Sequence, residues 1–198
     1  MPELPEVETV RLGLSKIVYN SKIEDVDVLR SDLRWKIKKS LKHDLENDYF
    51  KQPLRRGKYI LIPTIKDNIF LIHLGMSGQI KIRDNFESIF KHDHVRMTIK
   101  SENDKRYFII YNDPRRFGYI DLFHKKDIDE HFLLKKLGVE PFEKNFNVGY
   151  LQKIFDKKIK CIKDTLMDQS VIAGIGNIYA SEILFKAKVN PYRSTKTL

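Results

Sequence analysis

The first twenty residues carry a clear helical pattern. Their apolar positions recur three and four residues apart, at Val7, Val10, Leu14 and Ile17. This spacing places them on one face of a helix, and Pro5 suits the first helical turn, where a missing N–H costs nothing. We therefore predict an amphipathic helix over residues 5–18.

Short β-rich segments occupy the next hundred residues. We expect strands at 23–29, 59–65, 69–72, 79–82, 95–99, 107–111 and 118–123. Turn-forming pairs such as Asp67-Asn68 and Asn103-Asp104 separate them. Several short strands with this spacing are typical of an antiparallel sandwich or barrel.

The pattern changes again after residue 138, where helical periodicity returns. We expect helices over 148–159, 163–167 and 178–187, joined by short turns. The predicted fold class is α+β, with an N-terminal helix plus an antiparallel β-sandwich followed by a partial helical domain. The corresponding domains are 1–138 and 139–198.

Charge and cysteine content narrow the functional classes. Lys and Arg number 37 against 27 Asp and Glu, a formal net charge of +10. This excess favours polyanionic partners, although many merely soluble proteins are also basic. Cys161 is the only cysteine, which excludes an intramolecular disulfide and a cysteine-based zinc site within the chain. No apolar run approaches the roughly 20 residues of a membrane span, so we expect a cytosolic protein.

The N-terminus offers a candidate nucleophile. Pro2 becomes a free secondary amine if Met1 is removed, and attack of this amine on a sugar C1′ gives an iminium. That iminium has no N–H to lose, so it stays cationic and serves as an electron sink for elimination. The alternative is that Pro2 and Pro5 only lead into a helix whose first turn is acidic because of the helix dipole.

Four further motifs have a functional and a structural interpretation. The basic cluster that includes Lys58 is either catalytic or a solvated face, and Met76 and Phe117 are either wedges inserted into a base stack or sheet-packing residues. His92-x-His94 resembles a metal pair on a strand, but the spacing suggests no third ligand, and a hydrogen-bonded structural histidine is the commoner alternative. The glycine-rich segment before Asn177 lacks a preceding strand, so it favours a phosphate-binding helix start over a dinucleotide fold.

Taken together, the motifs resemble the formamidopyrimidine-DNA glycosylase family of bifunctional base-excision repair enzymes. The resemblance runs from Met1 to about Arg193. Six strings carry it, in the family's order: Pro2-Glu3-Leu4-Pro5-Glu6-Val7-Glu8-Thr9-Val10, Arg55-Arg56-Gly57-Lys58-Tyr59, His73-Leu74-Gly75-Met76-Ser77-Gly78, Lys91-His92-Asp93-His94-Val95, Asp113-Pro114-Arg115-Arg116-Phe117-Gly118 and Gly174-Ile175-Gly176-Asn177-Ile178-Tyr179-Ala180-Ser181-Glu182.

The resemblance implies a role for each catalytic candidate. Pro2 is the Schiff-base nucleophile, Glu3 protonates the opening sugar and shuttles protons, and Glu6 supports them. Lys58 lies near the damaged nucleotide, where its ammonium assists base departure and holds the adjacent phosphate. The implied reaction removes oxidised purines, such as 8-oxoguanine and formamidopyrimidines, with β- and then δ-elimination. It requires no dissolved cofactor.

The resemblance also implies the DNA contacts. Met76 acts with Arg115 and Phe117 to fill the space of the extruded nucleotide, His73 faces a phosphate, and His92 lies at the DNA surface. The helical part corresponds to the family's helix-two-turn-helix domain, with three phosphate contacts at Lys158, Lys163 and Asn177. The expected partner is damaged double-stranded DNA. The endonuclease VIII type, which prefers oxidised pyrimidines, shares the Pro-Glu start, but Met76 and the residues after Glu3 favour the purine type.

The sequence departs from the family at its C-terminal end. Family members continue into a four-cysteine zinc ribbon, so zinc is expected in full-length members, whereas this sequence ends at Leu198. The alternative function is therefore an impaired or non-catalytic DNA-binding fragment. We expect uncovered apolar surface on residues 148–190, a monomer when the chain is complete, and a bacterial-type cytoplasmic, nucleoid-associated protein without membrane contact.

Overall fold

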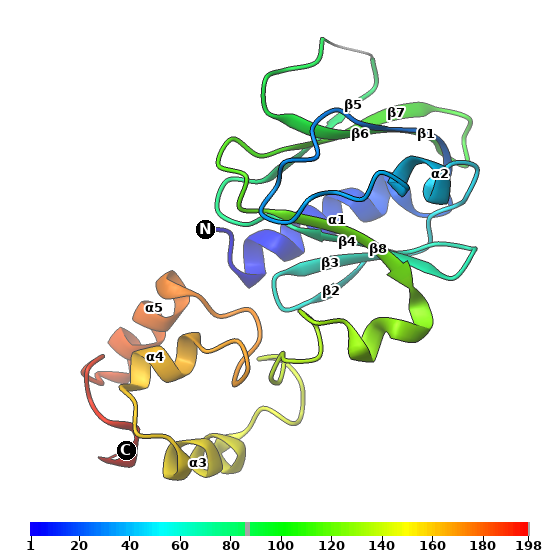
Figure 1. Ribbon diagram of the computed structural model, residues 1–198. Helices are drawn as coiled ribbons and strands as arrows, with labels where there is room; N and C mark the ends of the chain where they lie inside the picture. The colour runs from blue at the N-terminus through cyan, green and yellow to red at the C-terminus, as the bar shows by residue number, and fades with distance from the viewer. Residues whose placement is uncertain (86–87, 198) are drawn as a thin grey trace. The chain divides into compact units, whose positions relative to one another are not determined.

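The computed structural model describes residues 1–85 and 88–197, which divide into two compact units (Figure 1). The first unit comprises residues 1–55 and 59–128, and the second comprises residues 56–58 and those from 129 onward. Each unit is described by itself. The predicted boundary at residue 138 stays a prediction.

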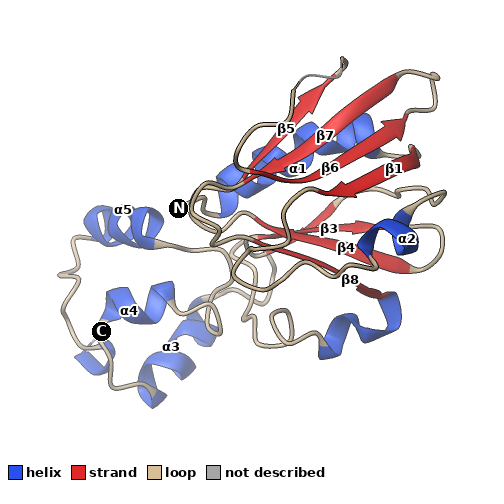
Figure 2. Cartoon of the chain, turned by 45° about the horizontal axis from the view of Figure 1, so that its top comes forward, coloured by secondary structure: helices blue, strands red, loops and turns tan. Residues whose placement is uncertain are grey.

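The first unit contains two four-stranded sheets (Figures 1 and 2). One has the order β1-β6-β7-β5 and the other β2-β3-β4-β8. The strands are β1 (Lys22–Val28), β2 (Leu54–Arg56), β3 (Tyr59–Pro63), β4 (Asn68–His73), β5 (Gln79–Arg83), β6 (Asp93–Lys100), β7 (Arg106–Asn112) and β8 (Tyr119–His124). The ladders β1·β6, β6·β7, β5·β7, β3·β4 and β4·β8 are all antiparallel.

Two helices complete the core of this unit. They are α1 (Leu4–Val18) and α2 (Leu41–Leu45), and a 3-10 segment, η1 (Lys125–Glu130), follows β8. The apolar stripe of α1 is buried with α2 and the inward faces of both sheets in one cluster, which includes Val7, Leu14, Leu41, Ile72 and Ile109. Burial of this apolar surface is the main stabilising contribution to the unit.

The second unit is built from three short helices. They are α3 (Val148–Lys157), α4 (Ile162–Met167) and α5 (Asn177–Ala187), followed by a 3-10 segment, η2 (Thr195–Thr197). Their core is smaller and centres on Ile162, Leu166, Ile172 and Leu184. The Tyr150 hydroxyl on α3 also donates to the Val171 carbonyl at 2.7 Å, which joins α3 to the loop between α4 and α5.

The predicted fold class is confirmed, and the differences from the expected elements have identifiable causes. The helix expected over 148–159 ends at Lys157, because Lys158 is extended (φ −102°, ψ 133°) and its carbonyl accepts a hydrogen bond from Thr195 at 2.6 Å. The short elements α2 and β2 gave no sequence pattern that we recognised, since three to five residues are too few to show periodicity. Among the described residues, no helix is both long and apolar enough to cross a bilayer.

Candidate active site

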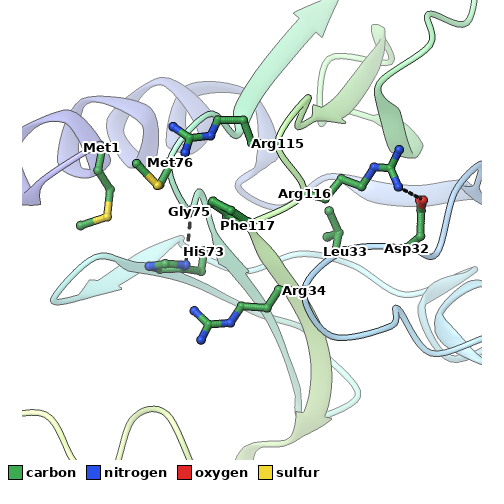
Figure 3. A pocket seen from close by; sticks show the side chains of 10 residues that line it. All are labelled: Met1, Asp32, Leu33, Arg34, His73, Gly75, Met76, Arg115, Arg116 and Phe117. Atoms are coloured by element: carbon green, nitrogen blue, oxygen red, sulfur yellow. Dashed lines mark hydrogen bonds and ion pairs between the residues drawn. The ribbon is translucent and has the colours of Figure 1, made fainter.

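A pocket of about 710 Å³ opens in the first unit beside the N-terminus (Figure 3). Its lining comes from the N-terminus, the segment before α2 and the loops that follow β4 and β7. The lining residues are Met1, Asp32, Leu33, Arg34, His73, Gly75, Met76, Arg115, Arg116 and Phe117. The structure thus brings together four of the residues expected at the DNA surface, which are His73, Met76, Arg115 and Phe117.

The two loops that carry Met76 and Phe117 touch through their backbones. Gly75 has φ +59°, and a Cβ at this position would lie 2.4 Å from the carbonyl carbon of Phe117. A Cβ at Gly118 would lie 1.6 Å from the Tyr111 hydroxyl oxygen. Only glycine fits either position without displacing a neighbour, so these glycines set the close approach of the loops.

Asp113 holds the same pair of loops together by hydrogen bonds. This fully buried carboxylate accepts from the Ser77 hydroxyl at 2.5 Å and from the Gly118 N–H at 2.8 Å. The Ser77 oxygen in turn accepts from the Arg115 N–H at 3.1 Å. A buried carboxylate with several donors rigidifies its surroundings, because losing any one donor would leave charge poorly solvated.

Tyr111 fixes the base of the two loops. Its hydroxyl donates to the His73 carbonyl at 3.1 Å. Burial, reinforced by the nearby Asp113 carboxylate, raises the pKa of Tyr111 above its ordinary value, so the hydroxyl remains a donor at neutral pH. The His73 ring accepts from the Gly75 N–H at 3.3 Å and packs against Tyr59, with ring centroids 4.7 Å apart.

On this rigid base, three side chains are left exposed. Met76 is 40% exposed and Phe117 is 45% exposed, although both are large and apolar. The Arg115 guanidinium lies 5.1 Å from the Phe117 ring centroid (Figure 3). The structure therefore excludes the alternative in which Met76 and Phe117 pack into the sheet. Apolar side chains held out on a rigid support are suited to insertion between bases.

The N-terminus enters α1 through a capping box. Glu3 is the N-cap residue, and its N–H donates to the Glu6 carboxylate at 2.9 Å. The Glu3 side chain is 2% exposed, Glu6 is exposed, and Pro2 is half-buried. Met1 reaches the pocket, whereas Glu3 and Glu6 do not line it. The capping box fixes the direction in which the chain enters α1, and it therefore fixes the position of Pro2.

Lys58 belongs to the second unit, in the turn between β2 and β3. Its side chain is buried, which excludes the interpretation as part of a solvated basic face. The preceding Gly57 has φ +55°, a conformation that favours glycine. Lys58 does not line the pocket of the first unit.

The two histidines of the His-x-His motif differ in environment. His94 is fully buried, and its two ring nitrogens lie 3.3 Å from the Arg30 carbonyl and 3.1 Å from the Asp113 carbonyl. His92 is half-buried, and its Nδ1 is a buried atom without a hydrogen-bond partner. The described residues hold no group of three or more His, Cys, Asp or Glu side chains suited to a metal ion.

The phosphate-contact candidates of the second unit have three different environments. Lys158 is paired with Asp168 at 2.5 Å. Lys163 is half-buried on α4. Asn177 is exposed as the first residue of α5, and the N-cap Gly176 provides no side-chain cap. As expected, a helix begins at Asn177.

Sequence reasoning missed Arg34 and Asp113. Arg34 lines the pocket, and its guanidinium lies 4.7 Å from the centroid of the Trp35 ring. Neither residue stood out in the sequence, because Arg34 is one basic residue among many and Asp113 appeared only as the first residue of a family motif. The Arg-Trp pair at 34–35 was a usable signal, since an arginine beside an exposed aromatic side chain often stacks on it.

Comparison with known proteins identifies the family. Residues 1–120 match the Formamidopyrimidine-DNA glycosylase N-terminal domain, and residues 137–198 match the Formamidopyrimidine-DNA glycosylase H2TH domain. The formamidopyrimidine-DNA glycosylase of Bartonella henselae is 42% identical over the whole chain and 71% of its own length. That of Ruthia magnifica is 45% identical over 98% of the chain and 69% of its own length.

Solved structures agree with this assignment. The wild-type Lactococcus lactis Fpg in complex with DNA containing N7-benzyl-Fapy-dG superposes with a TM-score of 0.90, at 33% identity, over 100% of this chain and 71% of that one. The same enzyme with abasic-site DNA gives the same TM-score over 99% of this chain and 70% of that one. The chain belongs to the formamidopyrimidine-DNA glycosylase family of DNA-repair glycosylases.

Proposed function

We propose that this chain excises oxidised purines, such as 8-oxoguanine and formamidopyrimidines, from double-stranded DNA and then cleaves the strand as a lyase. One observation carries the proposal: the N-terminus opens at the pocket whose wall presents Met76, Arg115 and Phe117. Removal of Met1 frees the Pro2 nitrogen beside a set of side chains suited to replace an extruded nucleotide.

The first chemical step is nucleophilic. The lone pair of the Pro2 nitrogen attacks C1′, the bond from C1′ to the damaged base breaks, and the base leaves with that electron pair and takes up a proton. The Pro2 nitrogen then gives up its own N–H proton, and its lone pair forms the double bond to C1′ as the bond from C1′ to the sugar ring oxygen breaks and Glu3 protonates that oxygen. The product is an iminium between Pro2 and C1′, which keeps its positive charge because a secondary amine has no second N–H to lose.

The second stage cleaves the strand. The iminium draws electrons toward nitrogen, so a proton leaves C2′ and the bond from C3′ to its phosphate oxygen breaks. A second elimination breaks the bond from C5′ to the other phosphate oxygen. In this proposal Glu3 shuttles the protons, Glu6 supports it through the capping box, and Lys58 holds the phosphate next to the damaged nucleotide.

The DNA partner is supported by charge and by the relatives. The net charge of +10 favours binding to a polyanion, and solved Lactococcus lactis relatives are described in complex with damaged or abasic DNA. We assign phosphate contacts to His73, Lys163 and Asn177, and a place at the DNA surface to His92. The Lys158 ammonium is paired with Asp168, so Lys158 contacts a phosphate only when the DNA displaces that carboxylate.

Borohydride trapping tests the nucleophile. Reduction of the iminium by borohydride should link the mature chain covalently to duplexes that contain 8-oxoguanine or an abasic site. Pro2→Gly should reduce trapping at least about tenfold, since the nucleophile then becomes a primary amine. The matched control carries one extra residue before Pro2, which blocks the amine and leaves all other side chains unchanged. Intact mass first establishes that Met1 is absent.

The same assay separates the alternatives. Salt-sensitive DNA binding without any adduct would contradict the enzyme proposal and favour a non-catalytic DNA-binding module. A Lactococcus lactis relative has also been solved with DNA containing an oxidised pyrimidine. A panel of both lesion types therefore tests the purine preference, which fails if oxidised pyrimidines are excised faster.

A further inference from the structure

A second buried carboxylate, that of Glu140, lies outside the pocket. Glu140 is 7% exposed and follows β8 and η1 in the second unit. Its Oε1 accepts from the Gly57 N–H at 2.5 Å and from Arg56 Nη1 at 3.1 Å. Both donors precede Lys58 directly in the sequence. A buried carboxylate is costly unless it is paired, so these contacts define the local backbone strongly.

Arg56 secures the same turn from its other guanidinium nitrogen. Arg56 Nη2 donates to the Leu137 carbonyl at 3.1 Å and to the Gly138 carbonyl at 2.5 Å. The guanidinium therefore donates hydrogen bonds to three acceptors in the segment 137–140. This planar group cannot rotate away without losing more than one hydrogen bond.

The turn also packs against the loop that leads into α5. A Cβ at Gly57 would lie 3.3 Å from the Ala173 Cβ and 3.6 Å from the Gly174 nitrogen. The Ala173 N–H in turn donates to the Val139 carbonyl at 2.9 Å. The turn is therefore held between the segment containing Glu140 and the loop that leads into α5.

We propose that Glu140 is a positioning residue for Lys58. This inference rests on the proposed function of Lys58 as the ammonium that holds the phosphate beside the damaged nucleotide. A lysine side chain is long and flexible, so its ammonium is well placed only if its backbone is fixed. Glu140 fixes that backbone one residue before Lys58, through the Gly57 N–H and the Arg56 side chain.

A purely structural role for Glu140 predicts a different result. If Glu140 only stabilises the second unit, its removal lowers the free energy of unfolding and acts on excision independently of Lys58. If it acts through Lys58, the effects of the two substitutions on the excision rate do not add. The double-mutant cycle therefore separates the two roles.

The experiment measures single-turnover excision on 8-oxoguanine duplex by the full chain. Lys58→Ala should slow excision about 100-fold, and Glu140→Ala about tenfold, because misplacing a catalytic group costs rate. In the Lys58→Ala background, Glu140→Ala should cost less than about twofold more. An undiminished tenfold loss in that background would overturn the inference.

Conservative variants keep the test valid if Glu140→Ala does not fold. Glu140→Gln retains an oxygen that accepts from Gly57, and should recover most of the rate. Glu140→Asp retains the charge but retracts it by one methylene, and should slow excision with little change in DNA affinity. Equal rates for Gln, Asp and wild type would overturn the inference. The matched control is Asp121→Asn, another buried, hydrogen-bonded carboxylate, and its excision rate should not change.

Failure of the proposed function is recognised separately. If Lys58→Ala excises at the wild-type rate, the role of Lys58 is wrong and the inference about Glu140 falls with it. Borohydride trapping through Pro2 would then still occur. If trapping itself is absent, the proposed function fails before Glu140 is tested.

Discussion

The loops around the pocket and the helices of the second unit both expose large apolar side chains, but on very different supports. Met76 and Phe117 stand on backbone that Asp113, Tyr111 and two close-packed glycines hold in place. In the second unit, exposed apolar residues lie on the short helices and on the segments that flank them, around a small core. The most exposed are Phe142, Val148, Ile159, Phe185 and Tyr192.

Exposure alone therefore does not mark a functional apolar side chain. Insertion of an apolar side chain between bases costs free energy, because the bases must unstack. The side chain can hold the bases apart only if its own backbone stays in place. The hydrogen bonds and close glycine contacts below Met76 and Phe117 meet that requirement. As expected from the sequence, the second unit does expose apolar surface over 148–190.

The largest expected effect comes from overpacking the joined loops. Gly118→Ala places a methyl group where the Tyr111 hydroxyl stands, so we expect a loss of about 3 kcal/mol in the free energy of unfolding. Urea denaturation measures this loss.

Gly13→Ala is the matched control. Gly13 lies within α1, and nothing lies within 4 Å of the added Cβ. This substitution should raise the free energy of unfolding by about 1 kcal/mol. Equal stabilities of the two variants would contradict the rigid-support interpretation.

A paired substitution of exposed phenylalanines sharpens the comparison. Phe117→Ala and Phe185→Ala should each change stability by less than about 1 kcal/mol, since Phe117 is 45% exposed and Phe185 is 81% exposed. Phe117→Ala should nevertheless weaken binding to damaged duplex about tenfold, because base stacking on an aromatic ring contributes about 1–3 kcal/mol. Phe185→Ala should leave binding unchanged. Fluorescence anisotropy with labelled duplex measures both, and similar affinities for the two variants would refute the distinction.

The smallest expected effect is a pH dependence confined to the second unit. Burial raises the pKa of Asp168, but hydrogen bonds from Lys158 and Ser170 outweigh it and lower the pKa to about 2. A lowered folded-state pKa adds stability above the unfolded value near 4, and that stability is lost as pH falls from about 4 toward 2. The contribution should be below about 1 kcal/mol, because the pair is partly exposed.

Thermal unfolding between pH 2 and 5 measures this dependence. Asp168→Asn should reduce the loss of stability between about pH 4 and pH 2. It should not alter the pH dependence of the first unit's stability. If the pH dependence of thermal stability has the same shape in Asp168→Asn as in the wild type, another carboxylate is responsible.

The helices and strands were largely readable from the chain because their periodicity is local. The α1 stripe from Val7 to Ile17 and the alternating strands reappear with shifts of one or two residues. The ends shifted where tertiary contacts intervened. Lys158, for example, leaves the helix because its carbonyl and ammonium both bind distant residues. The β2 strand escaped notice because a three-residue strand has no pattern of its own.

The candidate site was readable in part. The sequence indicated Met76, Arg115 and Phe117 through the family motifs, but it gave no reason to connect His73 with Tyr111 or Glu140 with Gly57. Those contacts join residues 38 and 83 positions apart. No local spacing encodes them, since the chain path between the partners sets their distance.

The basic charge, the α+β order of elements, the single cysteine and the motifs that define the family can all be read from the amino-acid sequence. Each follows from residue identity or from periodicity over a few turns of chain. The folded structure is needed to know which carboxylates are buried, which glycines admit a neighbouring backbone and which apolar side chains are exposed. Burial and close approach depend on segments remote in the chain, and they become fixed only when the sheets and helices pack.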